Sequence, residues 1–222
     1  MARVVVKVGG AVADRSAAAV LELASANEVC VVHGAGPQIS RDMEAAGVAV
    51  EFVGGRRVTT AAGIDIVRAS LASVNAALCA ALGADAVPLF GDEIGLEADP
   101  VPELGLVGEA RPGSLPAIDS ALAEGKLPVV APIAKGPLNV NADSSSAAIA
   151  RSIGADRLLF LTDVDGLILD GAVVEAIDLT AAEELIASGT LEGGIIPKLG
   201  AAIAAARSGV HASIGRTEVA PA

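Results

Sequence analysis

The chain is almost without aromatic side chains and carries a strong excess of negative charge. Its 222 residues contain no tryptophan or tyrosine and only three phenylalanines, and the formal net charge is −12. The aromatic platforms on which nucleic-acid bases stack are therefore scarce, and the charge would repel a phosphate backbone. We expect no nucleic-acid partner.

Cysteine is scarce as well. Cys30 and Cys79 lie in apolar stretches without the spacing of metal ligands, which predicts buried thiols and neither a disulfide nor a nucleophile. Asp163 and Asp165 resemble half of a calcium loop, but the remaining ligands are missing at the required offsets. We expect no metal site built by the protein itself.

Long apolar runs are also missing. No run reaches the roughly 20 residues that span a bilayer, and Met1 passes directly into strand-like sequence without the features of a secretory signal. The expectation is a soluble, cytoplasmic protein with no membrane partner.

What the sequence does contain is a regular alternation of apolar strands and alanine-rich helices. This alternation predicts an α/β fold, namely a three-layer αβα sandwich with a mainly parallel central sheet. The predicted strands are 4–8, 29–32, 86–90, 127–133, 157–161 and 210–214, and the predicted helices are 17–26, 37–46, 61–82, 115–124, 144–153, 181–188 and 197–208.

Two stretches depart from this alternation. Glycine and proline punctuate residues 91–113, which predicts antiparallel hairpins, and residues 48–52 are predicted as another hairpin arm. We expect two lobes, 1–135 and 136–222, that share one continuous sheet.

Lysine is rare, and two of the four lysines stand beside glycine pairs. Lys7 lies near the end of a run of valines and precedes Gly9 and Gly10, so its charge should project from a buried strand toward an anion that the glycine amides also approach. Lys198 falls in the first turn of a predicted helix, where its charge opposes the helix dipole unless an anion lies between them. Both patterns indicate a phosphate site.

Two polar segments add candidates. Asn139, Asn141 and Asp143 share one face of an extended segment, so they should converge on one spot, although Asp143 could instead cap the following helix. His33 ends an apolar strand and is either a base or a group that hydrogen-bonds the turn. Ile39 stands where a dinucleotide fold needs glycine, and no Walker motif is present, so any nucleotide site uses another geometry.

Six motifs in this order resemble the amino acid kinase superfamily and, within it, the acetylglutamate kinases. They are Lys7-Val8-Gly9-Gly10, His33-Gly34-Ala35-Gly36, Gly55-Arg56-Arg57-Val58-Thr59, Asn139-Val140-Asn141-Ala142-Asp143, Leu161-Thr162-Asp163-Val164-Asp165-Gly166 and Gly194-Ile195-Ile196-Pro197-Lys198. The resemblance implies ATP-dependent phosphorylation of the side-chain carboxylate of N-acetyl-L-glutamate in arginine biosynthesis. The alternatives are a related kinase for aspartate or carrier-linked aminoadipate and a non-catalytic sensor of ATP or an amino acid.

The resemblance also implies roles for individual residues. The catalytic group would be Lys7, Lys198 and Asp143; the substrate-binding group would be Ala35, Gly36, Arg57, Asn139 and Asn141; and the nucleotide-binding group would be Gly9, Gly10, Gly34, Asp163, Gly166 and Leu167. Magnesium would arrive with ATP, held mainly by phosphates and water.

The chain departs from this family in three places. Ala35 stands where relatives usually have the middle of three glycines, so its methyl group could crowd the substrate pocket. The chain ends soon after Thr217, and no helical extension precedes Arg3. We therefore expect a simple homodimer, paired through residues 61–82 and insensitive to arginine.

Overall fold

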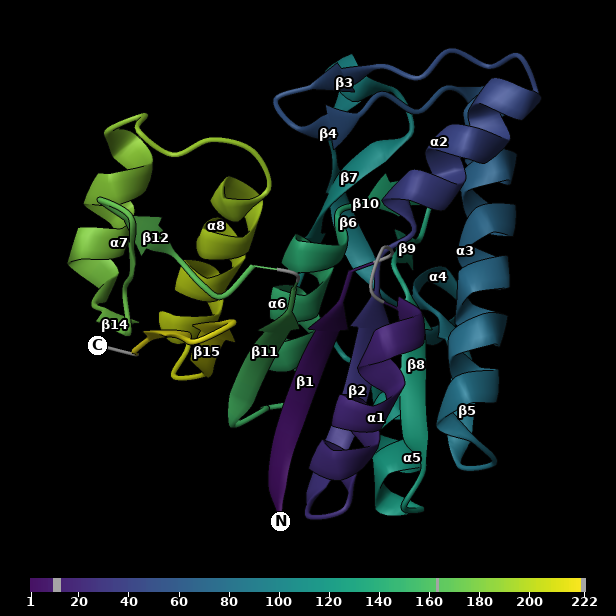
Figure 1. The fold of residues 1–222 in the computed structure, drawn as a ribbon. Coiled ribbons are helices and arrows are strands. Elements are labelled where there is room, and N and C mark those ends of the chain that lie inside the picture. The colour runs from purple at the N-terminus through teal and green to yellow at the C-terminus, as the bar shows by residue number, and fades with distance from the viewer. Residues whose placement is uncertain (10–12, 163, 221–222) are drawn as a thin grey trace.

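The computed structural model describes residues 1–9, 13–162 and 164–220, and it shows one large sheet between two layers of helices (Figure 1). The predicted three-layer α/β fold is confirmed. The strand order is β14–β16–β15–β11–β1–β2–β8–β5, with parallel pairing throughout except between β15 and β16. These strands are β1 Ala2–Val8, β2 Asn27–His33, β5 Ala86–Phe90, β8 Leu127–Ala131, β11 Arg157–Leu161, β14 Ala176–Ile177, β15 His211–Ile214 and β16 Thr217–Val219.

The helices fall close to their predicted positions. They are α1 Ala13–Ala24, α2 Gly36–Ala45, α3 Ala61–Leu82, α4 Gly91–Ile94, α5 Pro116–Ala123, α6 Ala142–Ser152, α7 Leu179–Ala187 and α8 Ile195–Ala206. The four-residue helix α4 has no counterpart among the predicted elements. α2 begins with proline at its first turn, where the missing N–H costs no helical hydrogen bond.

Side chains of β1 alternate between the two helical layers. Val4, Val6 and Val8 pack in one cluster with residues of α1 and α3, whereas Val5 belongs to the cluster that includes α5, α6 and α8. Because strand residues alternate in direction, Lys7 faces the same side as Val5. The alternation therefore directs Lys7 toward α6.

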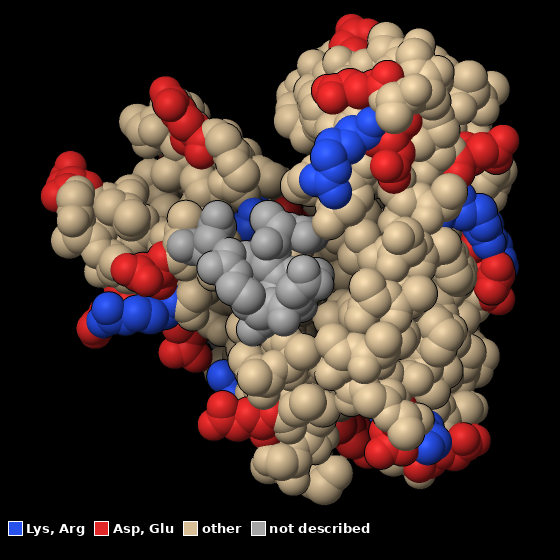
Figure 2. All heavy atoms as spheres, turned by 45° about the vertical axis from the view of Figure 1, so that its right-hand side comes forward, with Lys and Arg blue, Asp and Glu red and all other residues tan. Residues whose placement is uncertain are grey.

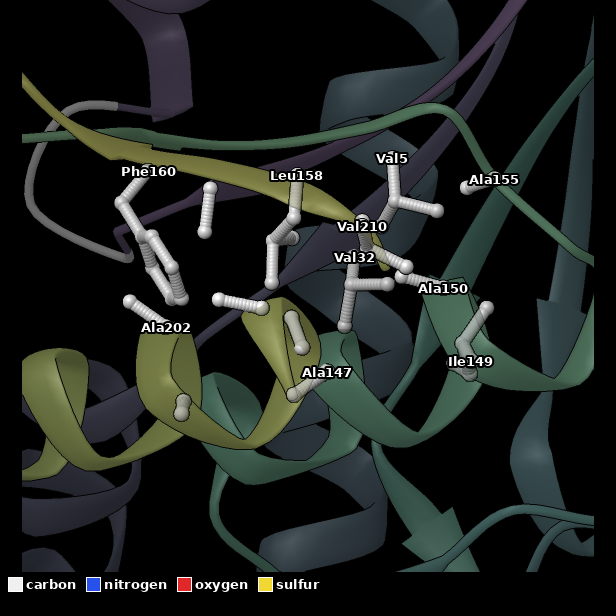
Figure 3. Close-up of a cluster of buried hydrophobic side chains, with 14 of the residues drawn as sticks. Val5, Val32, Ala147, Ile149, Ala150, Ala155, Leu158, Phe160, Ala202 and Val210 are labelled. Carbon is white, nitrogen blue, oxygen red and sulfur yellow. The ribbon is translucent and has the colours of Figure 1, made fainter. Parts of the chain in front are cut away.

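The hydrophobic cluster that contains Val5 is packed closely because its helices present alanine side chains to the sheet. In Figure 3, Val5, Val32, Leu158 and Phe160 extend from the strands toward the helical layer that carries Ala147, Ala150 and Ala202. Small side chains let helices approach a sheet closely, and dense packing of this kind leaves few alternative positions for the residues at helix ends.

A smaller sheet lies near the carboxyl ends of β1 and β2 and has the order β6–β7–β10–β9 (Figure 1). β6 and β7 pair antiparallel, as predicted for residues 91–113, while β7 and β10 pair parallel. Its strands are β6 Glu97–Pro100, β7 Val107–Arg111, β9 Ile133–Ala134 and β10 Leu138–Val140, with a short 3-10 helix at Pro102–Leu104.

Two predicted boundaries are wrong. The predicted strand 127–133 is broken at Pro132, which has no N–H for a sheet, so β8 ends at Ala131 and β9 joins the smaller sheet. The hairpin arm predicted at 48–52 is instead β3 Phe52–Val53, paired with β4 Arg56–Arg57. Gly54 and Gly55 have φ of 56° and 77°, and such a two-glycine turn fixes which residues pair.

A further hairpin comprises β12 Ile168–Leu169 and β13 Ala172–Val173.

One expectation about apolar segments also changes. Among the described helices, α3 is long and apolar enough to cross a membrane by length and composition, although the sequence reading found no such run. One face of α3 is buried through Val67, Leu71 and Leu78. A single apolar helix that packs on a core in this way is a weak indication of a membrane span.

Candidate active site

An ion pair lies where β1 ends and α6 begins. Lys7, near the end of β1, is 7% exposed, and Asp143, in the first turn of α6, is 5% exposed. The Lys7 Nζ lies 2.7 Å from the Asp143 Oδ1. The pair stands at the carboxyl edge of the parallel strands, which is where open α/β sheets bind ligands.

A second lysine reaches the same carboxylate from α8. The Lys198 Nζ lies 3.9 Å from the Asp143 Oδ2 and donates a hydrogen bond to the Gly194 carbonyl at 3.1 Å. Two ammonium groups therefore share one carboxylate, and these three side chains together carry a charge of +1. In a chain whose net charge is −12, this surplus favours an anionic ligand at this point.

Asn141 leaves the Asp143 carboxylate available for the lysines, because Asn141 is the residue that caps α6. Its Oδ1 accepts hydrogen bonds from the backbone N–H groups of Asp143 at 2.7 Å and Ser144 at 3.2 Å. The alternative in which Asp143 is the cap is therefore wrong. The segment offers several good cap residues in a row, so local pattern alone does not select one.

A cavity of about 260 Å³ lies on the Lys7 side of Asp143. It brings together residues that lie far apart in the sequence, at the ends of β1, β2, β4 and β10. Predicted site residues in its lining are Lys7, Gly34, Ala35, Gly36, Arg57, Asn139, Asn141 and Asp143. Its apolar lining includes Ile39, Leu71, Val107 and Pro132. The sequence reading missed these four because apolar residues that face a cavity follow the same pattern as core residues.

Arg57 is a buried cation in this cavity. It is 7% exposed, and its guanidinium carbon lies 4.6 Å from the centre of the Phe52 ring. The guanidinium donates hydrogen bonds to the Gly36 carbonyl at 3.0 Å and to the Ser40 Oγ at 2.7 Å. Burial lowers the pKa of Arg57. No carboxylate of the described residues pairs with its guanidinium, so a ligand carboxylate would compensate the buried charge.

Asn139 lines the same cavity and is hydrogen-bonded to Thr59, which is not part of the lining. The Asn139 Nδ2 donates to the Thr59 Oγ1 at 2.9 Å, and Thr59 is completely buried. Thr59 belongs to a recognised motif but was not predicted as a site residue. Its hydroxyl fixes the orientation of the Asn139 amide, so it supports the site from behind.

Ala35 is accommodated without backbone strain. Its φ is −139°, which lies outside the left-handed region that favours glycine, and it is 3% exposed in a cluster with Ile39 and Met43. At the next position, a Cβ on Gly36 would meet nothing within 4 Å. Compared with the glycine that relatives usually have here, Ala35 adds one buried methyl group at a position whose backbone conformation is accessible to any residue.

His33 is a neutral member of a buried hydrogen-bond network. It is 0% exposed, its Nε2 lies 3.1 Å from the Nδ2 of Asn75, and that Nδ2 also donates to the Val129 carbonyl at 2.9 Å. Burial lowers the pKa of His33 to about 4. The ring therefore joins α3 to the end of β2 through Asn75. Its Nδ1 also lies 3.5 Å from the Gly34 carbonyl of the turn, in agreement with the second of the two alternatives for this residue.

A second cavity, of about 460 Å³, lies on the Lys198 side of Asp143. Gly166 and Leu167, both predicted to bind nucleotide, line it together with Lys198 and Gly194, and Glu192 is exposed at its wall. Gly9 follows β1 directly. The predicted residues Gly10 and Asp163 lie outside the described part of the chain. Lys198 and the turn after β11 thus face one space, although more than 30 residues separate them.

Metal ligands are sparse around these cavities. The described residues contain no group of three or more histidine, cysteine, aspartate or glutamate residues that could hold a metal ion. The Asp143 oxygens are already close to Lys7 and Lys198. A magnesium ion at this site would therefore need phosphate and water oxygens as its main ligands.

Together the sheet, the paired lysines and the two cavities define an α/β kinase. The chain belongs to the amino acid kinase family, whose sequence profile matches residues 2–215. It is 41% identical to the acetylglutamate kinase of Rubrobacter xylanophilus, over 96% of this chain and 88% of the relative. It is 43% identical to the acetylglutamate kinase of Solibacter usitatus, over 94% of this chain and 88% of that relative.

Solved structures agree with this assignment of the fold. The crystal structure of smu.665 from Streptococcus mutans superposes with a TM-score of 0.89 at 28% identity and covers 99% of both chains. The family match over residues 2–215 and this superposition both extend over almost all of the chain.

Proposed function

We propose that this protein transfers the γ-phosphoryl group of ATP to the side-chain carboxylate of N-acetyl-L-glutamate, giving an acyl phosphate in arginine biosynthesis. The observation that carries the proposal is that one carboxylate, Asp143, lies between two lysines. Its Oδ1 is 2.7 Å from the Lys7 Nζ, and its Oδ2 is 3.9 Å from the Lys198 Nζ. Lys7 faces one cavity and Lys198 faces the other. Relatives more than 40% identical are acetylglutamate kinases.

The cavity beside Lys7 suits an amino acid derivative with two carboxylates. Arg57 would bind the α-carboxylate, since a planar guanidinium can hold a carboxylate through two hydrogen bonds. Asn139 and Asn141, which line the same cavity, would bind the amide or carboxylate oxygens, and Ala35 and Gly36 would contact the substrate backbone. The apolar residues Ile39 and Leu71 leave room for a methyl group such as that of an acetyl substituent.

The chemistry needs charge compensation more than acid–base catalysis. The substrate carboxylate is ionised at neutral pH, so its oxygen can form the new bond to the γ-phosphorus without a general base. The bond between that phosphorus and the β–γ bridging oxygen breaks, and ADP leaves with its electron pair. Lys7 and Lys198 would stabilise the charge on the transferring group from two sides, while Asp143 keeps both ammonium groups aligned.

The nucleotide would occupy the cavity beside Lys198, with Gly166 and Leu167 in its wall and the amides near Gly9, Gly10 and Gly34 close to its phosphates. Magnesium would compensate phosphate charge when bound. Because these phosphates are anionic, they would also relieve the unfavourable placement of Lys198 in the first turn of α8.

A hydroxamate assay tests the proposal directly, since hydroxylamine traps acyl phosphates. With Mg·ATP, we expect hydroxamate from N-acetyl-L-glutamate and little from glutamate, aspartate or aminoadipate. Omission of ATP is the control. A preference for another amino acid, or no product with any of them, would contradict the proposed substrate.

We also propose a cytoplasmic homodimer that pairs through α3. The exposed side of this helix carries Ala62, Ala69, Ala76 and Ala80, a stripe of small residues that lets two helices approach closely. Cys30 and Cys79 are both free, in agreement with a reducing compartment.

A further inference from the structure

Thr217 is completely buried at the start of β16, and none of the proposed site roles includes it. Its hydroxyl accepts a hydrogen bond from the Leu167 N–H at 2.7 Å and donates one to the Val174 carbonyl at 2.6 Å. The Val174 N–H in turn donates to the Leu167 carbonyl at 2.8 Å. Three segments of the chain are thus joined by a closed ring of hydrogen bonds.

This ring holds the turn that lines the second cavity through Gly166 and Leu167. The N–H and C=O of a trans peptide point in opposite directions, so the bond to the Leu167 N–H turns the Gly166 carbonyl away from Thr217. Gly166 has φ of 154°, and a Cβ there would lie 2.5 Å from the Thr217 Oγ1. The Thr217 hydroxyl therefore occupies space that a side chain on residue 166 would need, which explains why this position is glycine.

The residues just before Thr217 hold the other end of the same turn. The Arg216 N–H donates to the Asp165 carbonyl at 2.7 Å. Gly215 has φ of 54°, and a Cβ there would lie 2.6 Å from that carbonyl. Residues 215–217 thus hold both Asp165 and Leu167 in place.

We propose that Thr217 is a positioning residue for the nucleotide, acting through the Gly166–Leu167 peptide. This inference rests on the proposed function, because it takes the cavity beside Lys198 as the ATP site. Loss of the hydroxyl would leave the buried Leu167 N–H and the partly buried Val174 carbonyl without their partner, and the turn would shift to recover hydrogen bonds elsewhere. The acetylglutamate cavity, on the other side of Asp143, would keep its shape.

The test compares Thr217→Val, which keeps the shape but removes the hydroxyl, with Thr217→Ser, which keeps the hydroxyl. We expect Thr217→Val to raise the KM for ATP and the calorimetric Kd for Mg·ATP about tenfold, the change that a free-energy loss of about 1.4 kcal/mol produces. The KM for acetylglutamate should stay within about twofold, the scale of a minor perturbation. Thr217→Ser should restore most of the ATP affinity.

The reciprocal variant is Thr59→Val, because Thr59 is equally buried but supports Asn139 in the other cavity. It should raise the KM for acetylglutamate and leave the Kd for Mg·ATP unchanged. If Thr217→Val does not fold, Thr217→Ala replaces it, since alanine removes the hydroxyl without adding bulk.

Three results would overturn the role of Thr217: an unchanged Kd for Mg·ATP in the valine variant, an equal rise in both KM values, or a serine variant as weak as the valine variant. The calorimetric measurement separates this inference from the proposed function. If the wild-type protein binds Mg·ATP but does not phosphorylate acetylglutamate, the proposed substrate is wrong while the role of Thr217 is still tested. If it binds no Mg·ATP, both fail.

Discussion

At the scale of single residues, a small number of buried charged side chains defines the site, together with the groups that each of them contacts. Lys7, Arg57 and Asp143 are the buried charged residues of the described part of the chain. Burial of charge is costly unless a partner compensates it. Lys7 has Asp143 as its partner. Among the described residues, the hydrogen-bond partners of Arg57 are the neutral groups of Met43, Gly36 and Ser40. The unpaired cation thus marks the expected position of a ligand carboxylate.

Replacement of either lysine should lower turnover. We expect Lys198→Ala and Lys7→Ala to reduce kcat about 100-fold, because each removes a charge that acts on the transition state. Steady-state assays at saturating substrates provide the measurement. Lys126→Ala is the matched control, since Lys126 forms an exposed ion pair with Asp85 and should retain normal turnover. Turnover close to that of the control would exclude the proposed roles.

Arg57 should act on binding and not on the chemical step. We expect Arg57→Lys to raise the KM for acetylglutamate about tenfold or more with a smaller change in kcat, because an ammonium cannot reproduce the two-pronged contact of a guanidinium. Arg111→Lys, at an exposed ion pair, is the control and should not change the KM. A similar KM for both variants would contradict a carboxylate at Arg57.

At the scale of elements, one buried network joins α3 to the end of β2. Asn75 of α3 contacts both His33 and the Val129 carbonyl of β8. His33 immediately precedes the glycine turn of the substrate cavity. The middle of a long helix is therefore hydrogen-bonded to the strand end that positions this turn.

This network predicts a pH dependence of stability. The pKa of His33 is about 4 in the folded protein and 6.5 in the unfolded chain, so below pH 6.5 the unfolded chain takes up a proton that the folded protein does not. The free energy of unfolding should therefore fall as pH falls from 6.5 toward 4, by a total on the order of 3 kcal/mol from this residue.

Urea unfolding at pH 7, 6 and 5 measures the effect. His33→Gln keeps a hydrogen-bonding side chain but does not titrate, so its stability should fall less steeply over this range. His211, the other histidine, is exposed and is present in both proteins, so any contribution from it is common to the two. Parallel pH profiles for the two proteins would show that His33 does not cause the dependence.

At the scale of the whole molecule, residues from both halves of the sequence build one sheet. β5, β8, β2 and β1 come from residues 2–131, and β11, β15, β16 and β14 come from residues 157–219. The division into lobes 1–135 and 136–222 stays a prediction. Acidic side chains are scattered over the face in Figure 2, with lysines and arginines interspersed among them. The net charge of −12 opposes the binding of a large anionic partner.

The oligomeric state is a prediction at this scale. We expect light scattering to show a dimer whose mass does not change when arginine is added. Ala69→Glu and Ala76→Glu would place charge on the exposed face of α3 and should give monomers. Ser188→Glu, at the exposed residue directly after α7, is a control that should remain dimeric. An arginine-dependent hexamer, or dimers that tolerate both substitutions, would contradict pairing through α3.

The sequence by itself determined the local structure and the family. Valine runs, alanine-rich helices and glycine turns act over a few residues, so the order of the long strands and helices could be read from the sequence. The errors lie near Pro132, at the Gly54–Gly55 turn and in short elements that were not predicted, such as α4, β12 and β13. The six motifs also identified most residues that line the two cavities. These inferences succeed because backbone preference and periodicity are local properties.

The tertiary structure decided which of these residues meet. Lys7 and Lys198 lie on either side of one carboxylate only because β1, α6 and α8 pack at one edge of the sheet. The Asn141 cap, the desolvation of Arg57 and the ring around Thr217 likewise depend on contacts that local pattern does not specify. Such contacts depend on how the whole chain packs, since burial and hydrogen bonding between distant segments are properties of the assembled core.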